Sequence, residues 1–561
     1  MAELRADLIV KGRIATLAGE TGFGWVDALA IGGGRVLAAG SESEIEAFAR
    51  PRMRRLELGR GQVALPGLTD AHLHLVDAAQ AATELQLGPD ASLDTALALI
   101  GTWDRDRRAQ GDRDGWLLGR GWSFDGFGGW PLVAGLELVA PGRPIALWAH
   151  DHHARWFSPA AMHLAGIDAA TPDPAGGTLL RDDAGRPTGV ALEHAARLVE
   201  PAIPAPDPEA LAVAVEAYAR RLLRLGIVAV HDPGEVAPEP RLARGPRLYA
   251  RLAGEGRLPL RVHASVRAEQ LERAIELGLR SGQPTTVVAA DGDPLGGQPY
   301  ARAHVGWLKL FGDGSLGSRT AWLLEPYADT GLAGLPLTDP AELTHLVRLA
   351  AGAGLATQIH AIGDRAARTA LDAFAAVPDV RRLPLAPRVE HAQLVSAIDT
   401  RRFGRLGVAA SVQPSHLAGD GPAAGLAWPD RLADAYRWRS FVAGGAALAF
   451  GTDAPVESPD PWPGIALAVT RRPSPTAARF PGAEGLTMER AIRASILDPA
   501  IIAGEAGIRG RLTAGHLADL VVLPAAALDE PVRPAGALAT ARPLLTLLDG
   551  RESWRDASFD R

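Results

Sequence analysis

One stretch near the start of the chain decides the fold: Val63-Ala-Leu-Pro-Gly-Leu-Thr-Asp-Ala-His72-Leu-His74. It is an apolar run, typical of a strand, that ends in two histidines two residues apart. In a strand this spacing places both imidazole rings on one face. Two imidazoles supply half of the tetrahedral ligand shell that zinc prefers. Taken alone, the pair fits two solvated surface histidines better, so the remaining sequence has to decide between a metal site and a polar surface.

Length and composition limit the classes of protein to which the chain can belong. It has 561 residues and a formal net charge of -7, with the signs interspersed. This length accommodates a (β/α)8 barrel and about a hundred or more further residues. The sequence has no basic stripe for nucleic acid, no long apolar segment for a membrane and no signal peptide. We therefore expect a cytoplasmic protein whose partner is a small molecule; a homodimer remains open.

Two residue types are unusually rare. Cysteine is absent, which excludes disulfides and thiolate ligands, so any metal must be held by histidine, carboxylate or a modified side chain. Of the 58 basic residues only Lys11 and Lys309 are lysine. Lys309 lies in the strand-like run Val305-Gly-Trp-Leu-Lys-Leu-Phe311, where an unpaired charge would be costly to bury.

Lys309 has two interpretations. It can be a lysine whose charged end reaches solvent from the edge of a strand. Alternatively, its primary amine can react with carbon dioxide to form a carbamate, an anionic bridge between two metal ions that arginine cannot replace. We favour the carbamate, because the chain uses arginine for nearly every other positive charge.

Strand-like segments that end in polar residues recur along the chain and, with the first strand, make eight. The other seven span residues 226–232, 260–266, 305–311, 356–360, 387–391, 408–413 and 447–453. Segments with helical periodicity precede several of them, for example residues 208–225 and 341–353. This alternation predicts an α/β fold, a (β/α)8 TIM-type barrel whose active site lies at the C-terminal ends of its strands.

Three regions do not fit the simple barrel of residues 63–508. Residues 1–62 and 509–561 have strand and turn patterns, and we expect them to join into one small β-sandwich domain. Residues 82–209 form an insertion after the first barrel strand and hold six of the 13 tryptophans. These tryptophans can form the core of a subdomain or line an apolar substrate pocket. We expect the insertion to overhang the barrel mouth, with Trp122, Phe124 and Trp156 as substrate contacts.

Six polar residues fall at the predicted strand ends: His72, His74, Lys309, His360, His391 and Asp453. The motifs around them are Pro66-Gly-X-X-Asp-X-His-X-His74, Lys309-Leu-Phe-Gly-Asp313-Gly-Ser-Leu-Gly-Ser-Arg319, His360-Ala-Ile-Gly-Asp364-Arg365 and Val389-Glu-His-Ala-Gln393. Together with Gly510-Arg-Leu-Thr-Ala-Gly-His-Leu-Ala-Asp519, this set resembles the amidohydrolase superfamily of metal-dependent hydrolases. More specifically, it resembles the amidohydrolase 3 subgroup, which includes N-substituted formamide deformylases.

The resemblance implies a binuclear centre. His72, His74 and Asp453 would hold one divalent ion, His360 and His391 the second, and carbamylated Lys309 would bridge them. Zinc is the expected metal. A metal-bound hydroxide would attack the substrate carbonyl, the metal would neutralise the oxyanion, and Asp453 would act as the catalytic base.

Other polar residues are weaker candidates for substrate contacts. His231 and His263 also end strands, and they are equally typical of packed histidines or of groups that hydrogen-bond the ligands. Asp313 and Arg319 are more typical of loop-fixing ion pairs than of catalysis. In the run from His150 to Ser158, His153 matches the single histidine of the family pattern, whereas Ser158 stands where the family typically has asparagine.

The expected activity is hydrolysis of a carbon-nitrogen bond in a small non-peptide amide, with an apolar N-acyl or N-formyl substrate. An alternative is a mononuclear deaminase or cyclic-amide hydrolase of the same superfamily. Such deaminases commonly have a glutamate in a His-X-X-Glu element, where this chain has His360-Ala-Ile-Gly363. A third possibility is a non-catalytic scaffold, which the complete ligand set argues against.

Overall fold

The structure is a computed structural model, and it describes residues 5–88, 91–150, 154–174, 177–234, 244–285, 302–317 and 319–560. The chain divides into two compact units. One comprises Met1–Ala78 and Val215–Arg561, and the other is Ala79–Ala214. The larger unit holds all six predicted ligands.

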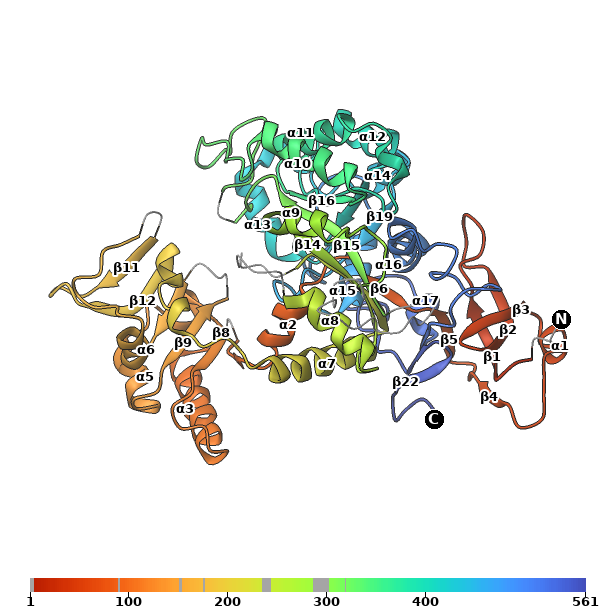
Figure 1. The fold of residues 1–561 in the computed structure, drawn as a ribbon, viewed down its shortest axis with the longest axis horizontal. Coiled ribbons are helices and arrows are strands. Elements are labelled where there is room, and N and C mark those ends of the chain that lie inside the picture. The colour runs from red at the N-terminus through yellow and green to blue at the C-terminus, as the bar shows by residue number, and fades with distance from the viewer. Residues whose placement is uncertain are drawn as a thin grey trace. The chain divides into compact units, whose positions relative to one another are not determined.

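A parallel eight-stranded sheet forms the predicted barrel, and its strands follow one another in chain order (Figure 1). They are β6 (Leu68–Asp70), β13 (Ile227–Asp232), β14 (Arg261–Arg267), β15 (Ala303–Phe311), β16 (Thr357–Ala361), β17 (Arg388–His391), β18 (Ala409–Val412) and β19 (Leu448–Phe450). The first and last strands meet where the Ala71 N–H donates to the Phe450 carbonyl at 2.9 Å. This contact closes the barrel, and the predicted fold class is confirmed.

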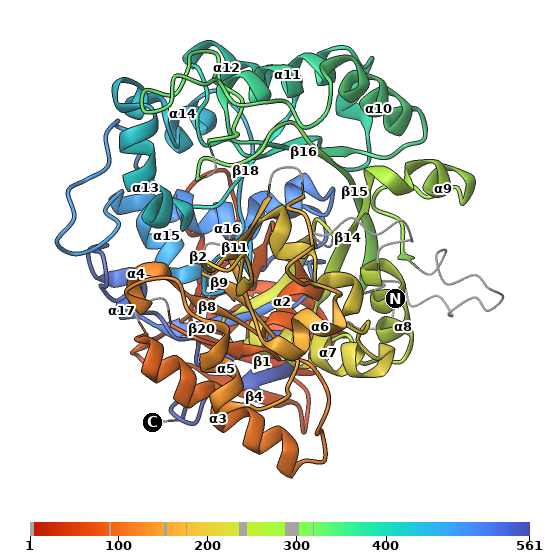
Figure 2. The ribbon, with the colours of Figure 1, turned by 90° about the vertical axis from the view of Figure 1, so that its left-hand side faces the viewer.

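Helices pack outside the barrel strands, as Figure 2 shows for α10, α11 and α12 around β16 and β18. The larger barrel helices are α7 (Pro208–Arg224), α8 (Arg244–Gly254), α10 (Pro340–Gly352), α11 (Asp364–Ala375), α12 (Ala397–Leu406), α13 (His416–Ala427), α15 (Pro461–Thr470) and α16 (Met488–Ile502), with the shorter α9 (Leu271–Glu276) and α14 (Trp438–Ala443). Both predicted helices are present as α7 and α10. The start of α10 is fixed because Asp339 caps it and Pro340 fits its first turn. Within the described ranges, no helix combines the length and apolarity needed to cross a membrane.

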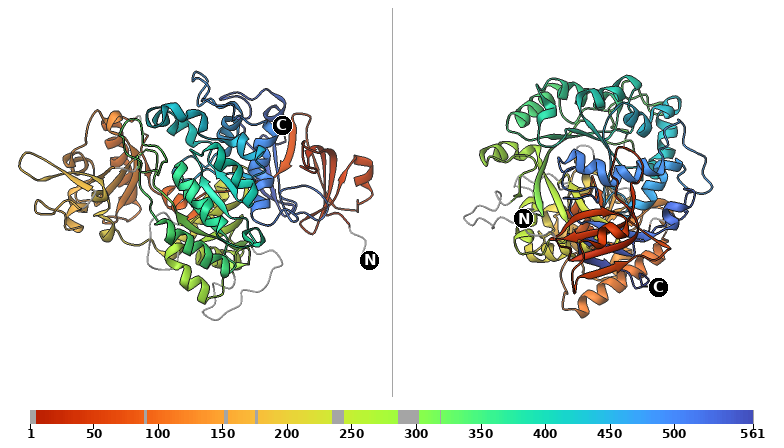
Figure 3. Two further views of the ribbon diagram at one scale, coloured as in Figure 1. Left: turned by 90° about the horizontal axis from the view of Figure 1, so that it is seen from above. Right: turned by 90° about the vertical axis from the view of Figure 1, so that its right-hand side faces the viewer.

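The two ends of the chain share a second sheet, in which strands drawn in red and blue lie side by side (Figure 3). Its strands are β1 (Leu8–Ala15), β2 (Trp25–Gly32), β3 (Arg35–Gly40), β4 (Arg54–Glu57), β5 (Gln62–Pro66), β20 (Leu520–Pro524), β21 (Leu545–Leu548) and β22 (Arg551–Arg555), with the short helices α1 (Glu42–Glu46) and α17 (Ala526–Asp529). Alternate residues of strands from both ends, such as Val10, Leu29, Val522 and Leu545, pack into one hydrophobic core.

The first predicted strand is divided at Gly67, which differs from our expectation. Residues before it form β5, which pairs with β1 and β20, and residues after it form β6 of the barrel. A side chain at Gly67 would collide with Val228, since its Cβ would lie 2.6 Å from a Val228 methyl group. The chain therefore passes from one sheet to the other at this glycine, not after residue 62.

The smaller unit has its own mixed six-stranded sheet, in the order β11-β12-β10-β9-β8-β7. Its strands are β7 (Leu85–Gln86), β8 (Leu117–Trp122), β9 (Ile145–Ala149), β10 (Ala154–Phe157), β11 (Gly177–Arg181) and β12 (Pro187–Glu193), and its helices are α2 (Leu75–Ala81, which begins in the larger unit), α3 (Leu93–Ala109), α4 (Phe124–Phe127), α5 (Val133–Val139) and α6 (Pro159–Leu164). Trp122 and Trp156 are fully buried in its hydrophobic core.

We predict that Gly451→Ala destabilises the barrel closure. A Cβ at Gly451 would lie 2.5 Å from the backbone nitrogen of His72 and 2.6 Å from the Cβ of His72. Relieving this collision would require the strand end to move. The expected loss in the free energy of unfolding is about 1–3 kcal/mol, measured by chemical denaturation. Gly352→Ala is the matched control, since nothing lies within 4 Å of its Cβ. Equal stability of the two variants would contradict this packing.

Candidate metal centre

The six predicted ligands gather at the C-terminal ends of the barrel strands. His72 and His74 follow β6 in a bend, so they lie just beyond the strand in which we expected them. Lys309, His360 and His391 lie near or at the ends of β15, β16 and β17, and Asp453 follows β19. Residues far apart in the sequence thus meet at one end of the barrel.

Asp453 is the point on which the two first-strand histidines converge. Its Oδ1 lies 3.3 Å from the Nε2 of His72 and 3.3 Å from the Nε2 of His74. The His391 ring joins them, because donor atoms of His72, His391 and Asp453 all lie within 4.8 Å of one another. Two imidazole nitrogens and a carboxylate in this arrangement fit a divalent ion of the zinc type.

The other nitrogen of each histidine is held by a hydrogen-bond acceptor. Nδ1 of His72 lies 2.6 Å from Glu390 Oε2, Nδ1 of His391 lies 2.8 Å from Gln413 Oε1, and Nδ1 of His74 contacts the Gly234 carbonyl. Such partners fix the ring and its tautomer, leaving Nε2 free as a metal ligand.

Glu390 is a fully buried carboxylate. Burial alone would raise its pKa, but the Arg388 guanidinium and His72 hold it down to about 2. Arg388 Nε lies 2.7 Å from Glu390 Oε1. The Glu390 carboxylate that contacts His72 is therefore ionised at neutral pH.

His360 and His391 adjoin each other, with ring centroids 4.5 Å apart. Nε2 of His360 donates to the Gly314 carbonyl at 3.0 Å. Burial lowers the pKa of His360 to about 3 and that of His391 well below its usual value. Both rings are therefore neutral at physiological pH, the state that a metal ligand needs.

Lys309 is 1% exposed, and burial lowers the pKa of its amine to about 8. Its Nζ lies 4.9 Å from the centre of the Phe311 ring. Over the ranges that the structure describes, this Nζ has no hydrogen bond and no ion pair. A buried amine of this kind loses its proton easily, and only the uncharged amine reacts with carbon dioxide.

The backbone at two ligands adopts a conformation that side chains disfavour. The φ angles of His391, Ala392 and Asp453 are +69°, +43° and +60°. Such residues cost roughly 1–3 kcal/mol each and cluster at functional sites. Hydrogen bonds hold them: the Asp453 N–H donates to the His72 carbonyl at 2.7 Å, and the Ala392 N–H to the Ala361 carbonyl at 3.0 Å.

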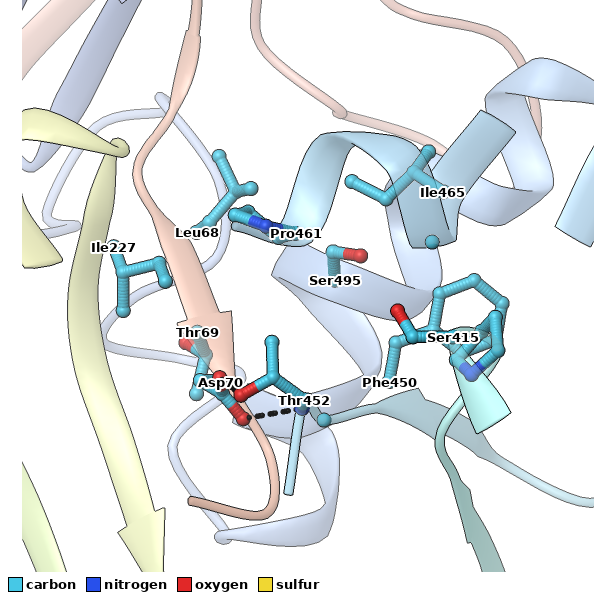
Figure 4. Close-up of a pocket in the computed structure, with 13 residues that line it drawn as sticks. Leu68, Thr69, Asp70, Ile227, Ser415, Phe450, Thr452, Pro461, Ile465 and Ser495 are labelled. Atoms are coloured by element: carbon cyan, nitrogen blue, oxygen red, sulfur yellow. Dashed lines mark hydrogen bonds between the residues drawn. The ribbon is translucent and has the colours of Figure 1, made fainter. Parts of the chain in front are cut away.

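Asp70 fastens the first strand to the last, and Figure 4 shows its contact with Thr452. Its carboxylate accepts from the Thr452 N–H and hydroxyl at 3.0 and 2.6 Å, and from the His72 N–H at 3.1 Å. Burial raises the pKa of Asp70 to about 6. The cavity beside this contact has a volume of about 20 Å³, room for a water molecule but not for a substrate.

Three candidate substrate contacts from the larger unit have local partners. His231 is buried against Trp307 and lies 3.2 Å from Arg388 Nη1. Asp313 is fully buried and accepts from the N–H groups of Trp322, Ile362 and Gly363 at 2.8–3.0 Å. Arg319 forms an ion pair with Asp329 at 2.6 Å. Arg319 thus fixes its loop through an ion pair as expected, whereas Asp313 does so through backbone hydrogen bonds instead.

The candidates from the smaller unit differ from one another. Trp122 donates from Nε1 to the Leu147 carbonyl at 2.8 Å, and with Trp156 it packs in the core of that unit. Phe124 is 46% exposed and packs edge to face on Trp130 at 4.8 Å. His153 lies outside the described residues. A substrate contact therefore remains a prediction for Phe124, whereas the two tryptophans serve as packing residues within their unit.

Sequence analysis overlooked several residues around the centre. His416 starts α13, stacks on His391 with centroids 5.7 Å apart, and brings its Nε2 to 3.5 Å from Asp453 Oδ2. Its position just after the seventh predicted strand could have identified His416 as a candidate from the sequence. Glu390 and Gln413 lie in the predicted strands 387–391 and 408–413. Only the fold shows which histidine each of them contacts.

Comparison with known proteins places this geometry in a family. The amidohydrolase family model matches residues 60–553. Protein LONG AFTER FAR-RED 3 from Arabidopsis thaliana is 30% identical over 94% of this chain and 89% of its own length. N-substituted formamide deformylase from Arthrobacter pascens is 26% identical over 98% of each. An uncharacterized metal-dependent hydrolase from Pyrococcus furiosus has a crystal structure with a TM-score of 0.73, at 26% identity over 92% of this chain and 98% of that one. The chain belongs to the amidohydrolase family.

We predict that Lys309 makes the stability of the metal-free protein rise with pH. Between a folded pKa of about 8 and an unfolded value of 10.5, the unfolded chain binds the extra proton, so raising the pH through this window favours the folded state. The gain is about 3 kcal/mol. Urea unfolding from pH 7.5 upward, an interval of about three pH units, measures it. Lys309→Met should abolish the rise and Lys11→Met should keep it; a rise that persists in Lys309→Met would assign it to other groups.

Proposed function

We propose that this chain is a metal-dependent hydrolase that cleaves the carbon-nitrogen bond of a small non-peptide amide with an N-acyl or N-formyl group. The observation that carries the proposal is the convergence of His72 and His74 on Asp453, beside a Lys309 amine that is buried and has no ion pair among the described residues. Amide hydrolysis needs an activated water, a proton carrier and stabilisation of an oxyanion. The similarity to a formamide deformylase supports this substrate class.

The donor set fits two divalent ions, for which zinc is the proposed metal. His72, His74 and Asp453 would hold one ion, and His360 and His391 the other, with the carbamate of Lys309 between them. Two features support the fit: His360 and His391 are neutral, and the outer nitrogens of His72 and His391 are held by Glu390 and Gln413. When bound, such ions lower the pKa of water and polarise a carbonyl oxygen.

Lys309 reaches the carbamate in one step that the site favours. The uncharged amine adds to carbon dioxide, a nitrogen-carbon bond forms, and one proton leaves from nitrogen. Burial disfavours the competing ammonium state, since it lowers the pKa of Lys309 to about 8. A mononuclear site needs no carbamate bridge between two ions. The buried Lys309 therefore favours the binuclear proposal over a mononuclear deaminase.

Asp453 is suited to move the proton of the attacking water to the leaving nitrogen. Burial would raise its pKa, but His72 and His74 hold the pKa well below its usual range, so the carboxylate is ionised. Its Oδ1 faces the two histidines and its Oδ2 faces His416. The Gln393 amide nitrogen lies 3.4 Å from His416 Nδ1, and the Nε2 of His416 faces Asp453 at 3.5 Å. His416 thus limits where this carboxylate can turn.

The activity is tested by a panel of N-formyl amines, N-acyl amines, lactams and esters offered to the zinc-loaded enzyme. We expect release of amine and carboxylic acid, lost after chelation and restored by zinc. Ammonia released from amino-substituted heterocycles, without amide turnover, would favour the deaminase. No turnover by a protein with a full metal complement would favour the scaffold.

Asp453→Asn should lose activity and keep much of the metal. The amide retains the shape and one donor oxygen but cannot accept the proton of water. A loss of roughly 10²- to 10⁴-fold in kcat is expected for a missing general base. Elemental analysis of the same sample controls for metal loss. Near wild-type kcat would show that another residue is the base.

Lys309→Arg should lose tight binding of two metal ions together with activity. Arginine keeps the charge and approximate length but forms no carbamate. We expect about two zinc ions per wild-type chain after zinc-supplemented expression and clearly fewer in the variant, as metal affinity depends on the ligand set. Lys11→Arg is the matched control. A fully metallated, active Lys309→Arg enzyme would make this lysine structural.

A further inference from the structure

A second group of metal-ligating side chains lies in the larger unit, away from the candidate centre. His263 comes from β14, His304 from β15, and Glu505 from the segment that follows α16. Donor atoms of all three lie within 4.8 Å of one another. The His263 and His304 rings stack with centroids 5.2 Å apart.

This cluster is separate from the site at the strand ends. His263 pairs with His304 in the sheet, whereas Arg267 pairs with Lys309 further along the same two strands. His304 precedes Lys309 by five residues, which corresponds to roughly 16 Å along a strand. One metal ion cannot serve both groups.

The cluster borders a cavity of about 310 Å³, lined among others by Arg261, Ser281 and Leu517. His263 is 1% exposed, and the buried Nδ1 atoms of His263 and His304 have no hydrogen-bond partner within the described part of the chain. Buried polar atoms without partners are costly, and a bound water or ion is one way in which a protein satisfies them.

The three groups are in the protonation state that a metal requires. Burial lowers the pKa of His263 to about 3 and also lowers that of His304, so both imidazoles are neutral. Burial would raise the pKa of Glu505, but Arg509 and His263 lower it to about 2.

The charged groups nearby leave part of Glu505 available. Arg509 bonds Oε2 of Glu505, while Oε1 lies 3.6 Å from His263 Nε2. The Arg261 guanidinium in the same cavity is paired with Asp519 and Asp549. Oε1 can therefore serve as a ligand while Oε2 keeps its ion pair.

We propose that His263, His304 and Glu505 form a further site for one divalent ion of the zinc type, with its fourth position open to the cavity. Three protein ligands and one exchangeable position are a common zinc arrangement. Zinc bonds of about 2.0–2.2 Å place donors roughly 3.4 Å apart, so small side-chain rotations complete the shell. The ion would join β14 and β15 to the segment after α16.

Zinc-soaked crystals of the wild-type protein test the site without any assay of activity. Anomalous density at the zinc edge is expected among His263, His304 and Glu505, at bonding distance from their donor atoms. A map that has zinc at His72 and Asp453 but nothing here would overturn the inference while leaving the proposed function intact. Zinc at His263, His304 and Glu505 with none at the strand ends would support this site and contradict the proposed metal centre.

Variants supply a second measurement in solution. His304→Ala and Glu505→Gln should each reduce the zinc bound per chain by one, after metal depletion and titration with zinc alone. The exposed His163→Ala is the control and should bind as wild type does. Glu505→Gln can fail to fold, because Arg509 loses its partner. In that case the zinc content of His304→Ala and the zinc map of the wild-type crystals test the site. Unchanged zinc content in His304→Ala contradicts the site.

Discussion

The joint between the first and last barrel strands is the constraint on which the candidate centre depends. Hydrogen bonds from Thr452 to Asp70 and from Asp453 to the His72 carbonyl bring the two ends of the barrel sequence together. Gly451 permits this approach, because any side chain there would collide with His72. A carboxylate from the eighth strand and two imidazoles from the first thus share one point. Without barrel closure these three donors would be separate polar groups.

Burial and neighbouring charges together set the charge state of several groups around that point. It keeps His360 and His391 neutral and lowers the pKa of Lys309, whereas neighbouring cations and imidazoles keep Glu390 and Asp453 ionised. Neutral nitrogen ligands, anionic oxygen ligands and an uncharged amine are the forms in which these side chains bind metals or react with carbon dioxide. The low polarity of the barrel interior thus prepares the chemistry that the proposed function requires.

Periodicity and strand-end polarity predicted the barrel, both tested helices and the set of six residues that gather at one end. They could not predict the division of the first strand at Gly67, since that depends on contact with Val228 from a neighbouring strand. They also missed His416 and the roles of Glu390 and Gln413, because these arise from pairs brought together only by folding. Composition likewise could not tell tryptophans in a core from those in a pocket.

The most direct test of the binuclear account is carbon-13 NMR of the zinc-loaded protein prepared with labelled bicarbonate. The account predicts a carbamate carbon resonance that disappears on acidification and is absent from Lys309→Arg. Elemental analysis of the same sample gives the number of ions per chain. Two bound ions with no carbamate resonance, and Lys309 present as a free amine, would contradict the account.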